Sequence, residues 1–442
     1  MIAHILVVVD ASGDRLLVDR ASGMLPVVRA PPVSSGEVAE LNRSAHQLLG
    51  NPVFALRCLQ NDINPTTRKP RHQVHLLESV RPLEAASSSW RAVDCEQIKP
   101  FSITPHAAIF DPVQAMQRHA ARRPWWQPGF AQASLGWLEQ TAPAIGAGRV
   151  TAVEQLRCWE FAWLVRVTTE QGSWYLKCSP PPLDIEADIV ERLAEIRPQN
   201  VPHLAARYRA GSGFLMPAYS GPLLSDCDRP AAWIDTAAEF ARLQVSAIDA
   251  TSDLVARGVP RRTSADLHAG IAELFGGQMN DMQRRAGIRD NEIETLRDAL
   301  PRFSEMIGEL DRLGVPLSID HGDLWAPNVI IGADGPRFLD WSDASIGHPF
   351  FSMLPLLTAD AITAPLERDP RLRTRMRQAY LEPWQRLLGT NSLLRAWKLA
   401  RPLAALQLAA SYCQRILPLV DTEHQVYRTL GWFLRLAIRY RH

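Results

Sequence analysis

The chain has few cysteines, and their spacing matches no known kind of cysteine site. The six are scattered over 442 residues without a C-x-x-C pair: Cys58, Cys95, Cys158, Cys178, Cys227 and Cys413. Structural zinc sites and the disulfide frameworks of small secreted domains need paired or regularly spaced cysteines. The sequence therefore predicts neither, and scattered free thiols are typical of a reducing compartment.

An excess of one charge and long apolar runs are also missing. Lys and Arg number 48 against 47 Asp and Glu, which leaves a net charge of +1. A nucleic-acid partner usually requires a basic patch, so we expect none. The apolar run Ile5–Val9 ends at Asp10, is too short to span a membrane and has no basic leader. We therefore expect no signal peptide, no membrane partner and a cytoplasmic location.

The sequence does contain one stretch, residues 319 to 341, in which polar side chains recur at informative spacing. Asp323 precedes Asn328, and two short β-type runs then lead to Asp340. The runs are separated by Gly332-Ala333-Asp334-Gly335, which predicts a β-hairpin. Because a hairpin brings its ends together, Asn328 and Asp340 should emerge at the same end, near Asp323. One proton acceptor and two hard oxygen ligands for Mg²⁺ are what phosphoryl transfer requires.

This stretch carries a resemblance to a known family. His321-Gly322-Asp323-Leu324, with Asn328 and Asp340-Trp341, resembles the catalytic signature of the aminoglycoside phosphotransferase and choline kinase superfamily of protein-kinase-like enzymes. The resemblance implies that Asp323 accepts the substrate proton and that Asn328 and Asp340 bind Mg²⁺ on the phosphates of ATP. A surface turn followed by an ordinary hairpin is the competing interpretation, which the number of matching positions disfavours.

Upstream of the signature, the chain has the pattern of a small β-rich lobe. Three strands and a helix are predicted, at Val150–Leu156, Phe161–Thr168, Ser173–Cys178 and Asp184–Ile196. The resemblance implies that Lys177 contacts the nucleotide phosphates and that Glu186 orients it, with Glu191 as the competing partner. It also implies that the backbone around Met216 and Ala218 forms the inter-lobe linker that meets the adenine.

The turn Arg157-Cys158-Trp159-Glu160 has no glycine, unlike a protein-kinase phosphate loop. Small-molecule kinases often lack these glycines, so the absence favours that branch of the resemblance, although it leaves open how the turn covers the phosphates. Three positions depart from the family pattern. Gln244 stands where a His is usual. His348 and Ser352 replace two aspartates, the second of which commonly braces the catalytic loop in the family. Ser352 can donate a hydrogen bond but carries no charge, so we expect a weakened brace and slower catalysis.

Residues 1 to 117 have an α+β pattern, with a strand hairpin, a helix that ends at Gly50 and further strands. The order is similar to a Nudix domain. Nudix chemistry needs glutamates on the helix to hold Mg²⁺, but the corresponding positions are Ser44, Gln47 and Leu48. We therefore expect a Nudix-like domain without Nudix catalysis. An unrelated α+β accessory domain is the alternative.

The predicted fold class is α+β, a bilobal protein-kinase-like fold preceded by the Nudix-like domain. The predicted domains are 1–117 (accessory), 118–148 (helical linker), 149–221 (kinase N-lobe) and 222–442 (kinase C-lobe). In the linker, we interpret Trp125 and Trp126 as packing rather than as a ligand site. The expected function is phosphate transfer from ATP, with Mg²⁺, to a hydroxyl of a small molecule. A pseudokinase-like regulatory module and a Nudix pyrophosphatase are the alternatives, and the sequence specifies neither the acceptor nor the oligomeric state.

Overall fold

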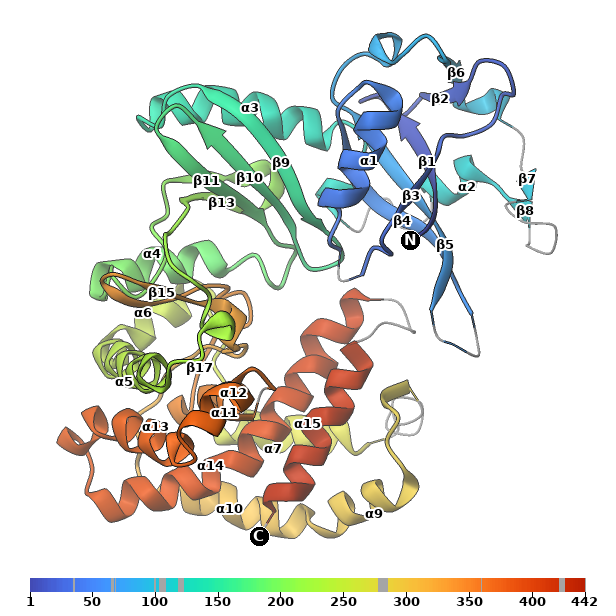
Figure 1. Ribbon diagram of the computed structural model, residues 1–442. Coiled ribbons are helices and arrows are strands. Elements are labelled where there is room, and N and C mark those ends of the chain that lie inside the picture. The colour runs from blue at the N-terminus through green and yellow to red at the C-terminus, as the bar shows by residue number, and fades with distance from the viewer. Residues whose placement is uncertain are drawn as a thin grey trace. The chain divides into compact units, whose positions relative to one another are not determined.

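The computed structural model describes residues 1–442 except 35, 65, 66, 68, 99, 100, 103–108, 118–122, 277–284, 359, 421–425 and 442. It divides into two compact units (Figure 1). The first comprises Met1–Pro180 and Ala205–Ala218, and the second comprises Pro181–Leu204 and Tyr219–His442. The predicted boundaries after residues 117 and 148 both fall inside the first unit. They stay predictions, as do residues 118–122 of the linker, which lie outside the described residues.

The first sheet of unit 1 has the strand order β4-β5-β1-β2-β6, with β3 paired to β1. The strands are β1 (Ile2–Val9), β2 (Arg15–Asp19), β3 (Val27–Ala30), β4 (Val53–Ile63), β5 (Pro70–Ser79) and β6 (Trp90–Asp94). The predicted hairpin of β1 and β2 is confirmed, and β1 also runs parallel to β5. Separate apolar clusters cover the two faces of the sheet, which explains why β1 is a continuous apolar run rather than an alternating one.

Helix α1 (Ala39–Leu49) packs on this sheet and ends as predicted at Gly50, whose φ of +70° is the left-handed conformation of a helix C-cap. Short elements follow: β7 (Phe101–Ser102), β8 (Ile109–Phe110) and α2 (Pro112–Gln117). Helix α3 (Phe130–Ala144) then begins at a buried carboxylate. Glu78 of β5 accepts hydrogen bonds from the N–H groups of Gly129, Ala131 and Gln132, at 2.9 to 3.2 Å. A side chain of the first sheet therefore caps the N-terminus of α3, and α3 packs on the second sheet of the unit.

The second sheet of unit 1 is antiparallel with the order β12-β13-β11-β10-β9. Its strands are β9 (Val150–Cys158), β10 (Trp163–Thr169), β11 (Gly172–Cys178), β12 (Ala206–Tyr208) and β13 (Gly213–Pro217), which confirms the three predicted strands. One face packs into a core shared with α3 and β4, where Phe130 meets Trp163 edge to face at 5.1 Å. Trp125 and Trp126 are buried in the same core, which confirms that they pack rather than line a ligand site.

Unit 2 is mainly helical. Its helices are α4 (Glu186–Ile196), α5 (Pro230–Ser246), α6 (Thr251–Ala256), α7 (Ser264–Leu274), α9 (Asp290–Asp298), α10 (Leu300–Arg312), α11 (Met353–Thr358), α12 (Thr363–Arg368), α13 (Leu372–Leu381), α14 (Thr390–Ser411) and α15 (Val426–Tyr440). Two small strand pairs lie among them: β14 (Ser318–Asp320) with β17 (Ser345–Gly347), and β15 (Val329–Gly332) with β16 (Gly335–Phe338).

Pro402, followed by apolar residues at helical spacing over Leu403–Leu417, predicts the first turn of a helix, and this prediction is wrong. Helix α14 starts at Thr390 and continues through Pro402 to Ser411. An internal proline costs a helix about 3 kcal/mol. Buried side chains on both sides of it, from Leu393 to Ala410, provide the packing that offsets this cost.

The helices give a limited result on membranes. Among the described residues, no single helix is both long and apolar enough to cross a bilayer. One bent pair, Pro349–Thr358 with Asp360–Arg368, meets the criterion by length and composition alone.

Candidate active site

The β15–β16 hairpin confirms the predicted geometry of the signature. Val329 pairs with Phe338, and the Leu339 N–H donates to the Asn328 carbonyl oxygen at 2.8 Å, so the two ends of the hairpin lie side by side. The Asn328 side chain turns toward Asp323, where its Nδ2 donates to the backbone oxygen at 2.8 Å and to Oδ2 at 3.1 Å. The structure therefore brings Asp323 and Asn328 together.

Asp323 lies in an electrostatic environment that favours its protonated form. Burial of the carboxyl raises its pKa well above the usual range, and the charges of Asp343 and Asp340 raise it further. Hydrogen bonds from the Trp325 and Asn328 side chains act in the opposite direction. Three carboxyl groups thus lie close enough to affect one another's ionisation, and strongly perturbed groups of this kind are common at functional sites.

Asp340 has a strained backbone at the end of the hairpin. Its φ of +62° is in the left-handed region, which is uncommon for residues other than glycine, although Asp tolerates it better than most. Ser342 Oγ donates to Asp340 Oδ1 at 2.9 Å and fixes the side chain. The next peptide is also held, because the Trp341 N–H donates to Glu186 Oε1 at 3.1 Å. Glu186 is buried on α4, so within its own unit this predicted site residue anchors the segment that carries Asp340.

Gly322, between His321 and Asp323, is required by its surroundings. Its φ is +76°, and a Cβ at this position would collide with the backbone oxygen of Asp343. The glycine thus allows the catalytic loop to lie directly against the segment after Asp340.

The brace of the catalytic loop has kept a carboxylate, contrary to the expectation from Ser352. Ser352 Oγ accepts the His321 N–H at 3.0 Å and donates to Asp320 Oδ1 at 2.6 Å. Asp320 and Ser352 are both buried. Burial raises the pKa of Asp320, while the bond from Ser352 and the charge of Arg262 oppose the rise. The anion that the family places at the position of Ser352 is here supplied from the strand before the loop.

Gln244 connects this brace to the helical core. Its Nε2 donates to the carbonyl oxygens of Ile319 at 2.7 Å and Pro349 at 2.9 Å, and its Oε1 accepts from the Tyr380 hydroxyl. Its own carbonyl oxygen accepts from Ser318 Oγ at 2.6 Å. Gln244, where the family usually has His, therefore satisfies several buried polar groups at once.

The residues fit a magnesium ion that is also held by a nucleotide. Since the Asn328 Nδ2 is committed to Asp323, its Oδ1 faces away as a candidate ligand, and Asp340 offers a carboxylate. Within the described residues, no group of three or more His, Cys, Asp or Glu could hold a metal. Mg²⁺ at phosphate-transfer sites is commonly bound by one or two protein oxygens plus phosphates and water, so a pair of ligands is sufficient.

Aromatic side chains lie beside Asp323, and one of them, Trp325, forms a side-chain hydrogen bond with it. Trp325 and Trp432 of α15 have ring centroids 5.3 Å apart, and both are partly exposed. Tyr412 begins a π-helical turn, Tyr412–Ile416. Burial raises the pKa of its hydroxyl, and the charges of Asp323 and Asp343 raise it further. π-helical turns are frequent at functional sites. The proximity of Trp432 and Tyr412 could not be read from sequence, because each lies more than 80 residues after Asp323.

The other predicted site residues belong to unit 1. Lys177 lies on β11, and Met216 lies on the adjacent β13, where it pairs with Tyr175. Because side chains alternate along a strand, Lys177 and Met216 lie on the same face of the sheet, opposite the face that carries Leu176 and Leu215 into the core. The Ala218 N–H donates to the Ser173 oxygen at 2.9 Å and extends the pairing beyond β13.

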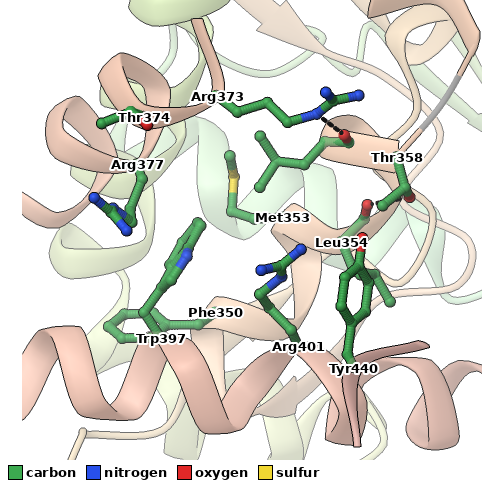
Figure 2. Close-up of a pocket in the computed structure, with 11 residues that line it drawn as sticks. Phe350, Met353, Leu354, Thr358, Arg373, Thr374, Arg377, Trp397, Arg401 and Tyr440 are labelled. Carbon is green, nitrogen blue, oxygen red and sulfur yellow. Dashed lines mark hydrogen bonds between the residues drawn. The ribbon is translucent and has the colours of Figure 1, made fainter. Parts of the chain in front are cut away.

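A cavity of about 180 Å³ lies elsewhere in unit 2 and contains none of these residues (Figure 2). Arg373, Arg377 and Arg401 line it above an apolar floor that includes Trp397. Arg401 stacks over the Tyr440 ring at 3.9 Å. Tyr440 lies eight positions after Trp432 on α15, which corresponds to about 12 Å along a helix. The cavity is therefore separate from the aromatic pair beside Asp323.

Comparisons with known proteins concern the family and the fold of the chain. Residues 159–407 match the model of the phosphotransferase enzyme family. A choline kinase from Cryptosporidium parvum Iowa II is 12% identical, with 70% of this chain and 94% of that chain covered and a TM-score of 0.50. An ethanolamine kinase from Plasmodium vivax is 14% identical, with 65% and 82% covered and a TM-score of 0.46. A spectinomycin phosphotransferase in complex with ADP and spectinomycin is 9% identical, with 70% and 97% covered and a TM-score of 0.45.

No curated protein matches the chain. The likeness to the choline kinase confirms the predicted protein-kinase-like fold of a β-rich and a helical lobe, while the Nudix-like assignment of the N-terminal part stays a prediction. Because the family match extends over more than half of the sequence and includes the whole signature from His321 to Asp340, the chain belongs to the phosphotransferase enzyme family.

Proposed function

We propose that this protein transfers the γ-phosphoryl group of ATP, with Mg²⁺, to a hydroxyl of a small molecule. The observation that carries the proposal is the contact between Asn328 and Asp323. The Asn328 amide nitrogen donates to Asp323 Oδ2 at 3.1 Å and so holds the proposed base beside the proposed Mg²⁺ ligand. Orientation of this kind, together with charge stabilisation, accounts for most of the catalysis in phosphoryl transfer.

Each residue has a distinct role in the proposed reaction. Asp323 accepts the proton of the acceptor hydroxyl as that oxygen attacks the phosphorus atom. Asn328 Oδ1 and Asp340 hold Mg²⁺, which neutralises phosphate charge when bound. Lys177 also neutralises phosphate charge, and Glu186 keeps the Asp340–Trp341 segment in position. The backbone at Met216 and Ala218 contacts the adenine.

The surroundings of Asp323 favour an acceptor that carries a positive charge. Asp343 adds a carboxylate that is neither the proposed base nor a proposed Mg²⁺ ligand, and the rings of Trp325 and Trp432 lie near Asp323 with their centroids 5.3 Å apart. An ammonium group over an aromatic face gains about 0.5 to 2 kcal/mol, depending on its desolvation. We therefore propose a hydroxyl-bearing amine as the acceptor class.

Two further proposals come from the sequence. We propose a cytoplasmic location for the protein and domain boundaries after residues 117, 148 and 221.

A screen for ADP release against a panel of hydroxyl-bearing metabolites tests the function. Each hydroxyl compound that carries an amine should be paired with an uncharged analogue that lacks the amine. The same experiment then measures whether a positive charge on the acceptor increases the rate. Asp323→Ala should lower transfer by about 10²- to 10⁴-fold, the usual contribution of a general base, while Mg-ATP binding persists.

The matched control is Asp334→Ala, which removes an exposed carboxylate from the turn of the same hairpin. Full transfer by Asp323→Ala would contradict the assignment. Mg-ATP binding without turnover on any acceptor would instead favour the pseudokinase-like alternative. Hydrolysis of nucleoside diphosphates that survives Asp323→Ala would favour a Nudix-type activity.

A further inference from the structure

The β9–β10 turn, defined here as residues 157–162, occupies the position at which kinase-like folds cover the nucleotide phosphates. It contains no glycine, so the backbone freedom that such a loop normally uses is missing. In this structure the turn is held by segments that precede the kinase-like part of the chain, and all of them belong to unit 1. The contacts come from three places, the loop before α1, the linker before α3 and strand β4 of the first sheet.

The loop before α1 pairs with the end of β9 like a short extra strand. The Cys158 N–H donates to the Gly36 oxygen at 2.8 Å, and the Val38 N–H donates to the Leu156 oxygen at 3.2 Å. Glu37 and Arg157 form the antiparallel bridge between them, with their charged groups 3.7 Å apart. We call residues 36–38 the clamp segment.

Gly36 permits this pairing to be close. Its φ is +71°, and a Cβ on it would collide with the Trp159 side chain and would lie 2.8 Å from the Cys158 oxygen. Because both the backbone conformation and the space require glycine, any side chain here would push the clamp segment away from the turn.

The linker before α3 holds the next two residues of the turn. Trp125 donates its indole N–H to the Trp159 oxygen at 2.9 Å, and Arg123 Nε donates to the Glu160 oxygen at 2.7 Å. Both donors are buried. Within the turn, Trp159 packs edge to face on Phe161 with ring centroids 4.8 Å apart. Three successive residues of the turn, 158 to 160, are therefore tied to chain outside the kinase-like part.

The strand that leads into the turn is anchored as well. The buried Gln155 side chain makes two hydrogen bonds to the Ala55 backbone, at 2.7 and 2.8 Å, and accepts a third from Asn42 at 2.7 Å. Cys158 Sγ donates to the Leu56 oxygen at 2.9 Å. These contacts join β9 to α1 and β4 of the first sheet.

We infer that the N-terminal segment positions the nucleotide, because it fixes the β9–β10 turn through contacts that replace the glycine-rich sequence of a protein-kinase phosphate loop. This inference rests on the proposed function, since it takes the turn to be the phosphate-covering loop. Gly36 and Trp125 are positioning residues that do not touch substrate. Fixing the turn in advance removes the ordering cost that a free loop would pay when nucleotide binds. Loosening it should therefore weaken nucleotide binding and leave the acceptor site in unit 2 unaffected.

The test compares two glycines with the same backbone conformation. Gly36→Ala introduces a collision with Trp159, whereas Gly23→Ala, also at φ +71°, meets nothing within 4 Å. Both variants carry the same backbone strain, so any difference between them reports the contact with the turn. Trp125→Phe is the second test variant, because it keeps an aromatic ring in the core and removes only the indole N–H and part of the ring volume.

Two measurements are made on the full chain. Hydrogen exchange of residues 157–162 should be faster in Gly36→Ala and Trp125→Phe than in the wild type and Gly23→Ala. The Kd for Mg-ADP, measured by calorimetry below the unfolding temperature, should rise about tenfold in the two test variants, as expected when one or two hydrogen bonds that hold a site are lost. The KM for an acceptor should stay unchanged.

The outcomes separate this inference from the proposed function. If hydrogen exchange of residues 157–162 is unchanged in folded Gly36→Ala and Trp125→Phe, the clamp segment and the linker do not hold the turn. This outcome would overturn the inference whatever the Kd for Mg-ADP. Faster exchange with an unchanged Kd for Mg-ADP would overturn the positioning role. A wild-type chain that binds no Mg-ADP at all would contradict the proposed function itself. An equal weakening in Gly23→Ala would mean that the effect is general destabilisation, which also overturns the inference.

Discussion

At the scale of single residues, the brace of the catalytic loop shows how one chemical requirement can be met from a different position. Ser352 Oγ donates a short hydrogen bond to Asp320 Oδ1 and also accepts one from the His321 N–H. The family usually has Asp at the position of Ser352. In this chain, an Asp there would lie against the buried carboxylate of Asp320.

We therefore predict that Ser352→Asp, which restores the residue usual in the family, is more damaging than Ser352→Ala. Two buried carboxylates at hydrogen-bond distance cannot both ionise without a large cost, whereas Ser352→Ala leaves two polar groups unpaired at about 1 to 3 kcal/mol each. The double variant Ser352→Asp with Asp320→Asn should recover most of the loss. Denaturant unfolding and turnover of the wild type, Ser352→Asp, Asp320→Asn and the double variant form a double-mutant cycle. Additive effects would contradict direct coupling.

A second prediction at this scale concerns pH. Asp323 must be ionised to accept a proton, and burial together with Asp343 and Asp340 raises its pKa. Activity should therefore rise with pH through a limb that lies above the usual range of an Asp. Asp343→Asn removes one of the charges that raise the pKa of Asp323. The rising limb of activity against pH should therefore move to lower pH in this variant. The measurement is kcat/KM against pH for both proteins, and a limb that stays in place or moves to higher pH would refute the coupling.

At the scale of elements, structure that depends on residues close together in the sequence was predicted correctly. Structure that depends on residues far apart in the sequence was not. The β15–β16 hairpin followed from a Gly/Asp turn between two short runs, because all of its determinants lie within 13 residues, from Asn328 to Asp340. The brace could not be predicted, since Asp320 and Ser352 are separated by the whole hairpin and neither residue type is diagnostic. The start of α14 was missed because the proline rule is local, whereas the packing that carries the helix through Pro402 is tertiary.

Helix α3 gives a stability prediction at the same scale. Glu78 accepts three N–H groups at the start of α3, and a Gln at this position can accept through only one of its two terminal atoms. We expect Glu78→Gln to lower the free energy of unfolding by about 1 to 3 kcal/mol, because at least one buried N–H is left facing a donor. Chemical denaturation measures this. Glu139→Gln, an exposed position on α3 itself, is the control and should change little.

At the scale of the whole molecule, the parts that the sequence separates share a core. Trp163 and Val165 of the kinase-like sheet are fully buried against Phe54, Trp125 and Phe130, which come from the first sheet, the linker and α3. The sequence showed two α+β patterns but not that they pack together, because contact surfaces between segments leave no periodic signal of their own.

A truncated protein that starts at residue 149 should therefore be unstable. It would expose the Trp163 face of the second sheet, and contiguous apolar surface of this kind promotes association. We expect aggregation or loss of a cooperative thermal transition in scanning calorimetry, while the full chain unfolds cooperatively. A monomeric truncated protein with an unchanged transition would refute the shared core.

The discontinuous make-up of unit 1 also sets an order for its synthesis. All strands of the first sheet lie within the first 94 residues, but β13, the partner of β11, lies beyond residue 212. At translation rates of 5 to 20 residues per second, about 2 to 8 s pass between the emergence of β11 and that of β13. During this interval, β11 is a newly made edge strand with its outer hydrogen-bonding groups unpaired. The first sheet, already complete, offers the surface on which β9 and β10 can pack while the ribosome is still making β13.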